Sequence, residues 1–373
     1  MHPDYQNMMM EATRLTQGGD LAAATAMIQR ALGLADGNGE FSRPTAPAGR
    51  SAPPFAPDAR VIDVVAREIH VPPERDTIKS PVVDPAADPV ADRGQFIRGS
   101  FTHRAGAREY KLYAPPNAGA RPLPLLVMLH GCTQNADDFA RGTAMNEAAQ
   151  RQGFYVLYPE QSQKMNPQRC WNWFKHSHQE RGRGEPSMIA DLTRKISADY
   201  TIDASRVYVA GLSAGGAMAA IMGETYPDVF AAVGVHSGLA AGSATDLPSA
   251  LAAMQGGGKA PGMLQSGVPT IVFHGDADHT VNQRNAEQVI SASIGRNASL
   301  TPRPSPQNGR RKATRRVHVD AAGKTTAEIW TVHGAPHAWS GGNPAGTYTD
   351  AQGPDATAEL VRFFFDHSLR SPS

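Results

Sequence analysis

"VYVAGLSAGGAMAA", at residues 207–220, begins as a strand-like run of β-branched and apolar residues and continues as small residues that favour a helix. Ser213 stands at the change, between Gly211 and Gly215. A sharp strand-to-helix turn leaves no room for side chains beside its tip, so the G-x-S-x-G pattern is typical of a serine held exposed as a nucleophile. The pattern is short and also occurs by chance, so its interpretation depends on the rest of the chain.

Strand-like and helix-like segments alternate through residues 96–373. The strand-like runs are EYKLYAP (109–115), LPLLVMLHG (123–131), FYVLYPE (154–160), RVYVAG (206–211), AAVGVHS (231–237), PTIVFHG (269–275) and AEIWTVHG (327–334). The helix-like segments are 137–153, 187–200, 216–227 and 355–369, and the basic stretch 308–319 is expected to be a solvated loop leading into an edge strand. Nearly continuous apolar strands separated by helices predict an α/β domain with a mostly parallel sheet covered by helices on both faces.

Two further segments precede this domain. Residues 1–36 carry apolar side chains at helical spacing (Leu21, Ala24 and Ile28 among them), which predicts an N-terminal helical hairpin. A single hairpin cannot bury its own apolar face, so we expect it to dock on its own catalytic domain or on a partner. Residues 37–95 are rich in Pro and Ala and are interpreted as a linker.

Composition excludes several classes of function. A formal net charge of +1 with 19% charged residues offers no basic face for nucleic acid. The longest apolar stretch, 123–130, is too short to span a membrane. The N-terminus lacks the basic and apolar regions of a secretory signal, so we expect a cytoplasmic location, or a secreted one if a signal has been removed. Two cysteines exclude a disulfide scaffold and a Cys-rich zinc site.

Possible partners for Ser213 follow it in the order that a nucleophile elbow requires, first an acid and then a histidine. Asp276 and Asp278 come after the strand-like run 269–275, and His333 and His337 come after the run 327–334. The carboxyl ends of parallel strands meet at one edge of a sheet, where such side chains converge. Asp276 and His333 lie closer to their strands, whereas Asp278 and His337 lie further out, where they could reach toward the serine.

An oxyanion that forms during attack on a carbonyl needs two N–H donors. Ala214, directly after the serine, supplies one at a helix N-terminus, and the loop VMLHGCTQN supplies the other through Cys132, where Gly131 permits a close approach. His130 lies on a different strand from the proposed base, so we interpret it as structural. Cys132 is not expected to be the nucleophile, because no histidine follows it in a matching arrangement.

Five segments in order resemble the poly(3-hydroxybutyrate) depolymerase family of esterases, which are α/β-hydrolases related to feruloyl and acetylxylan esterases. The segments are LHGCTQNADDFA (129–140), CWNWF (170–174), GLSAGGAMA (211–219), HGDADHTVNQRNAEQV (274–289) and PHAWSGG (336–342), and the resemblance covers residues 100–367. It implies a serine esterase without a metal or organic cofactor. Matched to the family pattern, the nucleophile is Ser213, the base is His337 and the acid is Asp278, with Asp276 as the alternative acid.

Aromatic side chains and both cysteines lie within the matched segments. Trp171 and Trp173 alternate in RCWNWF, and Trp339 follows His337 by two residues. We expect Trp339 and one of the other two to line a substrate crevice, where aromatic rings hold an aliphatic chain by contact area. The resemblance makes a disulfide between Cys132 and Cys170 plausible, whereas a cytoplasmic location argues against it.

The leading hypothesis is a serine esterase acting on poly(3-hydroxybutyrate) or short 3-hydroxyacyl oligoesters. No secretory signal or separate substrate-binding domain is evident, which argues against attack on crystalline polymer outside the cell. A feruloyl or acetylxylan esterase is the nearest alternative. A non-catalytic binding protein, in which the hairpin carries the function, is less well supported because Ser213, Asp278 and His337 form a complete set. Peptide hydrolysis is a minor alternative, since no amine-binding acidic pair is evident.

Overall fold

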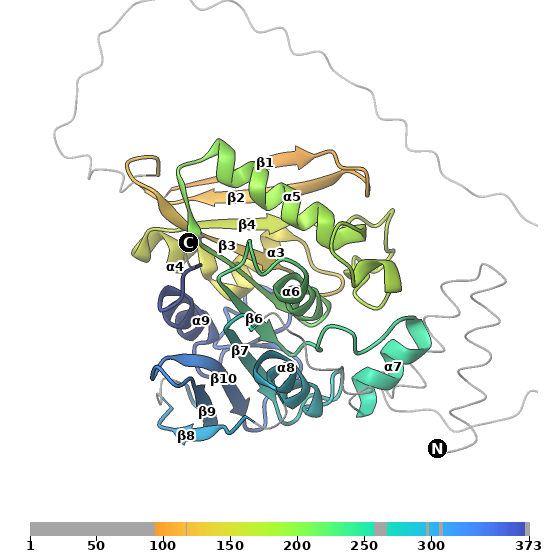
Figure 1. Cartoon of the computed structure of the whole chain (residues 1–373), viewed down its shortest axis with the longest axis vertical. Helices are drawn as coiled ribbons and strands as arrows, with labels where there is room; N and C mark the ends of the chain where they lie inside the picture. The colour runs from red at the N-terminus through yellow and green to blue at the C-terminus, as the bar shows by residue number, and fades with distance from the viewer. Residues whose placement is uncertain (1–93, 117, 257–266, 296–297, 306–308, 370–373) are drawn as a thin grey trace, which may run out of the picture. The chain divides into compact units, whose positions relative to one another are not determined.

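A ten-stranded sheet forms the centre of the described structure, a computed structural model that describes residues 94–116, 118–256, 267–295, 298–305 and 309–369 (Figure 1). The strand order is β1-β2-β4-β3-β5-β6-β7-β10-β9-β8. The strands are β1 (Gln95–Phe101), β2 (Arg108–Ala114), β3 (Leu123–Leu129), β4 (Tyr155–Pro159), β5 (Ile202–Leu212), β6 (Ala232–His236), β7 (Thr270–Gly275), β8 (Thr301–Arg303), β9 (Ala313–Val319) and β10 (Thr325–Val332). The six central strands, β4-β3-β5-β6-β7-β10, are parallel to one another. The outer strands, β1 and β2 at one end and β9 and β8 at the other, pair antiparallel with their neighbours.

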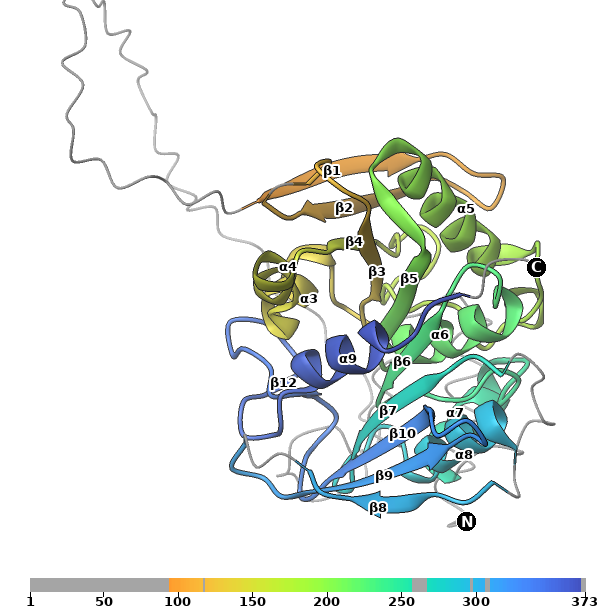
Figure 2. The same ribbon diagram turned by 60° about the vertical axis from the view of Figure 1, so that its left-hand side comes forward.

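Helices cover both faces of the sheet, as Figure 2 shows. On one face α5 (Gly184–Asp199), α6 (Ala214–Thr225), α7 (Leu247–Gly256) and α8 (Arg284–Ile294) contribute to one buried apolar cluster, and on the other α3 (Ala136–Thr143), α4 (Met145–Gln152) and α9 (Ala356–Phe365) contribute to a second. Successive residues of β3 alternate between the clusters, with Leu125 and Val127 in the first and Leu126 and Met128 in the second. A strand buried on both sides must be apolar at every position, which explains the continuous apolar runs. The predicted α/β-hydrolase architecture is confirmed.

The register of the central strands brings several loops to one edge of the sheet. Leu212 at the end of β5 pairs with His236 at the end of β6, and His236 pairs with Phe273 near the end of β7. Gly275 pairs in turn with Val332, the last residue of β10. The segments that leave β5, β7 and β10 therefore begin side by side, which is the arrangement expected of a parallel sheet that carries a site at its carboxyl edge.

Some local predictions differ from the structure. The predicted helix 137–153 is two helices, because Ala144 between them adopts a left-handed conformation with a φ of 51°. The stretch 308–319 includes β9, which is not an edge strand because β8 pairs on its outer side. The predictions for residues 1–36 and for the linker up to residue 93 lie outside the described residues.

Candidate active site

Ser213 occupies a sharp turn between β5 and α6. Its backbone has a φ of 57° and a ψ of −119°, a strained combination for a residue with a side chain. A Cβ atom at Gly215 would collide with the carbonyl oxygen of Leu129, and one at Gly211 would collide with the backbone of Gly215. The two glycines are therefore required by close packing of the turn against β3, and the structure has the geometry that G-x-S-x-G predicts.

Asp278 and His337 meet across two loops. Asp278 follows β7 and His337 follows β10, and the Nδ1 of His337 lies 2.7 Å from the Oδ2 of Asp278. The other carboxylate oxygen, Oδ1, accepts hydrogen bonds from the backbone N–H groups of Thr280 and Val281. These contacts fix the carboxylate, and an ionised carboxylate in turn holds Nδ1 of the histidine protonated, leaving Nε2 to act as an acceptor.

The environment of Asp278 keeps it ionised. Burial alone would raise its pKa, but hydrogen bonds and charge from His274 and His337 outweigh burial and hold the pKa well below its usual range. A lowered pKa in the folded state means that these contacts stabilise the fold at pH values above about 4, the ordinary aspartate pKa. That contribution is lost as the pH falls toward the lowered value, so Asp278 is a carboxylate throughout the neutral range.

The alternative acid, Asp276, forms a different pair. Its Oδ2 lies 2.8 Å from the Nδ1 of His333, and its Oδ1 accepts a hydrogen bond from the N–H of Gly334. This pair is much more exposed: the His333 side chain is 46% accessible, compared with 12% for His337. The Nε2 of His333 lies 2.9 Å from the hydroxyl of Thr314 on β9. Both ring nitrogens of His333 therefore already have partners, Asp276 and Thr314. This favours Asp278 and His337 as the partners of Ser213.

The loop after β3 approaches the turn that holds Ser213. A Cβ atom at Gly131 would lie 3.7 Å from the Cβ of Ser213, and the N–H of Gly131 is itself bonded to Gln134. Among the described residues, the N–H groups of Cys132 and Ala214 have no hydrogen-bond partner. A free N–H on the loop after β3 and another at the first residue of α6, both beside the serine, are what an oxyanion hole requires.

His130 belongs to the support of this loop. It is 1% exposed, its Nδ1 lies 2.7 Å from the carbonyl oxygen of Gly131, and its Nε2 accepts a hydrogen bond from the N–H of Gln161. Burial lowers the pKa of His130 to about 4, so the imidazole is neutral at physiological pH. These contacts are structural, as the sequence suggested.

His236 joins the elements of the site, and the sequence did not single it out. Its carbonyl oxygen accepts the N–H of Ser213, and its Nε2 accepts the N–H of Ser340, three residues beyond His337. Burial lowers its pKa to about 3, so the ring remains an acceptor. A neutral histidine at the end of β6 thus connects the turn of the nucleophile to the loop of the base. Its position at a strand end was visible in the sequence, but its two contacts were not.

The three tryptophans that were candidates for a substrate crevice lie in the core. Trp171, Trp173 and Trp339 are 0%, 5% and 1% exposed. The indole of Trp339 stacks on His236 and donates a hydrogen bond to Thr357. A ring packed on its faces by other side chains offers no surface to a bound chain, so this burial contradicts the prediction that Trp339 and Trp171 or Trp173 are walls of an open crevice.

Cys132 and Cys170 are joined by a disulfide in the structure. The bond connects the loop after β3 to the segment between β4 and α5. Next to it, the N–H of Thr133 donates to the carbonyl oxygen of Gln168. The loop that carries the Cys132 N–H is thereby fixed to the longer segment on its outer side.

The fold is that of an α/β-hydrolase, with Ser213, Asp278 and His337 in the segments that follow β5, β7 and β10. Comparison with known proteins identifies the family. The model of the esterase PHB depolymerase family matches residues 108–316, and the chain belongs to this family. It is similar to poly(3-hydroxyalkanoate) depolymerase C of Paucimonas lemoignei, with 34% identity over 243 residues that cover 60% of this chain and 58% of that protein. It is also similar to a poly(3-hydroxybutyrate) depolymerase of Ralstonia pickettii, with 28% identity over 277 residues that cover 67% and 55%. The chain thus spans a little over half the length of these relatives.

Related esterases also match. A probable acetylxylan esterase A of Aspergillus clavatus is 30% identical over 203 residues, which cover 49% of this chain and 65% of that protein. The acetyl xylan esterase of Aspergillus awamori superposes with a TM-score of 0.55 at 18% identity, covering 72% of this chain and 99% of that structure. At this identity the superposition shows a shared fold. No helix in the described part of the chain has the length and apolar character needed to cross a membrane.

Proposed function

We propose that this protein is a serine esterase that cleaves carboxylic esters through an acyl-enzyme. The observation that carries the proposal is the 2.7 Å contact between the buried carboxylate of Asp278 and His337, on the sheet edge where Ser213 occupies its strained turn. Family membership supports the same chemistry.

In the proposed reaction, Ser213 Oγ attacks the ester carbonyl carbon and His337 Nε2 takes the hydroxyl proton. Asp278 holds the resulting imidazolium in place. The N–H groups of Cys132 and Ala214 stabilise the oxyanion, and His337 then gives its proton to the departing alcohol. Water repeats the sequence on the acyl-enzyme, releasing the acid and restoring the serine.

For the substrate, we infer poly(3-hydroxybutyrate) or a short 3-hydroxyacyl oligoester. The support is that two relatives, which match 60% and 67% of this chain, are named depolymerases of such polyesters. A polysaccharide acetyl or feruloyl ester is the second candidate, favoured by the similarity to acetylxylan esterases. Because the tryptophans are buried, the proposal does not depend on an aromatic crevice.

Acid release from three substrates tests this choice: amorphous polyhydroxybutyrate granules, soluble 3-hydroxybutyrate oligomers and methyl ferulate. Each is assayed with the wild-type protein and with Ser213→Ala. We expect release from granules or oligomers that disappears in the variant. Activity confined to ferulate would retain the mechanism and contradict the substrate, whereas no Ser213-dependent release from any of them would contradict the proposal as stated.

A further inference from the structure

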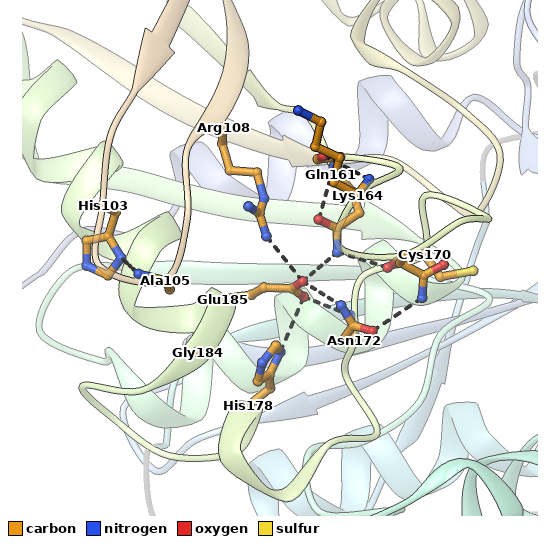
Figure 3. Close-up of polar contacts among 12 residues, drawn as sticks. His103, Ala105, Arg108, Gln161, Lys164, Cys170, Asn172, His178, Gly184 and Glu185 are labelled. Atoms are coloured by element: carbon orange, nitrogen blue, oxygen red, sulfur yellow. Dashed lines mark hydrogen bonds and ion pairs between the residues drawn. The ribbon is translucent and has the colours of Figure 1, made fainter. Parts of the chain in front are cut away.

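Glu185, the second residue of α5, is a buried carboxylate that no step of the proposed reaction uses. Its side chain is 1% exposed, and Figure 3 shows polar groups converging on it. Gln161 Nε2 donates to it at 2.5 Å, and Asn172 donates through both its backbone N–H and its Nδ2, each at 2.7 Å. Arg108 Nη2 and His178 Nδ1 lie 3.5 and 3.4 Å from its two oxygens.

The carboxylate is ionised despite its burial. Burial raises the pKa of Glu185, but hydrogen bonds and charge from His178, with the bonds from Gln161 and Asn172, lower it by more, so the net pKa lies below the usual value. Its place in the first turn of a helix adds the favourable field of the helix N-terminus. Burying a carboxylate without hydrogen-bond donors costs free energy. The fold therefore favours the positions in which the donors contact Glu185 over other positions of the same groups.

Three of these residues, Gln161, Asn172 and His178, come from one segment, residues 160–183, which connects β4 to α5 and contains only the short helix η1 (His176–His178). The backbone hydrogen bonds within this segment join residues three or four positions apart, so they do not connect its beginning to its end. Glu185 contacts this segment near its beginning at Gln161, in its middle at Asn172 and toward its end at His178. The carboxylate thus acts as the common anchor of the segment.

Two routes lead from Gln161 in this segment to the oxyanion loop. In the first, the N–H of Gln161 donates to His130 Nε2, and the Nδ1 of His130 lies 2.7 Å from the Gly131 carbonyl oxygen. In the second, Gln161 Nε2 also donates to the carbonyl oxygen of Cys170, whose sulfur is bonded to Cys132. Both routes begin at a residue bonded to Glu185 and end at residues 131–132.

We propose that Glu185 is a positioning residue that sets the placement of the Cys132 N–H in the oxyanion hole. This inference rests on the proposed function, since the role has meaning only if an oxyanion forms there. Glu185 touches no reacting atom: it acts through Gln161, His130 and the disulfide. Displacement of this donor weakens binding of the transition state more than binding of the ester ground state, so the effect falls on kcat.

Glu185→Gln tests the role. The amide keeps the size of the side chain, removes the charge and turns an N–H₂ group toward at least one of the existing donors. We expect kcat to fall about 10- to 100-fold with little change in KM, less than the roughly 10²- to 10³-fold loss seen when an oxyanion donor is removed outright. The inhibition constant of phenylboronic acid, which forms a tetrahedral adduct with an active serine, should rise by the same factor as kcat/KM falls.

Glu180→Gln is the matched control, because Glu180 lies in the same segment but pairs at the surface with His176 and Arg183. It should leave kcat, KM and boronate binding unchanged. If Glu185→Gln does not fold, Gln161→Leu interrupts the route to Cys170 while leaving Asn172 and His178 on the carboxylate, and we expect the same pattern with a smaller loss.

A merely structural role would lower the melting temperature of Glu185→Gln without changing kcat or boronate affinity in the folded protein at low temperature. That result, or a loss confined to KM, would overturn the inference. An active wild type with an unaffected variant contradicts only the role of Glu185. A wild type without Ser213-dependent hydrolysis contradicts the proposed function itself.

Discussion

Ser213→Ala should lower kcat for a 3-hydroxybutyrate oligomer by about 10⁵- to 10⁶-fold, since the nucleophile, base and acid of such a site act as a unit. The loss should appear in kcat, because the hydroxyl contributes little to binding the ground-state ester. Steady-state acid release, followed by pH-stat titration, measures it.

Ser249→Ala is a suitable control for this variant. Ser249 lies at the beginning of α7, and its N–H and hydroxyl groups hydrogen-bond to the nearby Asp246. Its replacement should leave kcat unchanged. A Ser213→Ala protein that retains a tenth or more of the wild-type rate would show that another residue attacks the ester.

Asp278→Asn should lower kcat by about 10⁴-fold, because an amide beside His337 Nδ1 favours the wrong tautomer of the imidazole. The Nε2 nitrogen would then carry the proton and could not accept one from Ser213. The structure offers a closely matched control in Asp276→Asn, which alters the exposed pair with His333. We expect that variant to keep nearly the full rate.

The comparison of the two variants in one assay decides which acid serves the site. Circular dichroism and thermal unfolding establish that both proteins are folded, which matters because Asp278 is also held by the N–H groups of Thr280 and Val281. A larger loss in Asp276→Asn than in Asp278→Asn would assign the acid to Asp276 instead.

The sequence predicted the fold and the segments of the site because both depend on regular patterns. Continuous apolar runs indicate strands buried on both faces, and a parallel sheet brings the loops after those strands to one edge. Ser213 and the two possible acid–histidine pairs could be placed because each follows such a run. The family pattern then selected Asp278 and His337, and the structure brings these two residues into contact.

Other features depend on contacts between distant segments, which no local pattern encodes. The bond between His236 and Ser340 joins residues 104 positions apart. The contacts of Glu185 come from β2 and from the segment 160–183. The prediction that Trp339 and one of Trp171 and Trp173 line a crevice rests on their nearness to the site in sequence, but proximity along the chain does not tell an exposed ring from a buried one. A disulfide such as Cys132–Cys170 is typical of oxidising compartments and does not favour a cytoplasmic location. The cytoplasmic location therefore stays a prediction.

Covalent labelling with a fluorophosphonate tests the central claim most directly, because the reagent reacts with a serine only when a base and an oxyanion hole activate it. Intact-mass spectrometry of the labelled wild-type protein, followed by peptide mapping, locates the adduct. We predict one adduct, on Ser213, and none on Ser213→Ala. A wild-type protein that remains unlabelled, or one labelled at another residue, would contradict the claim that Ser213 is an activated nucleophile.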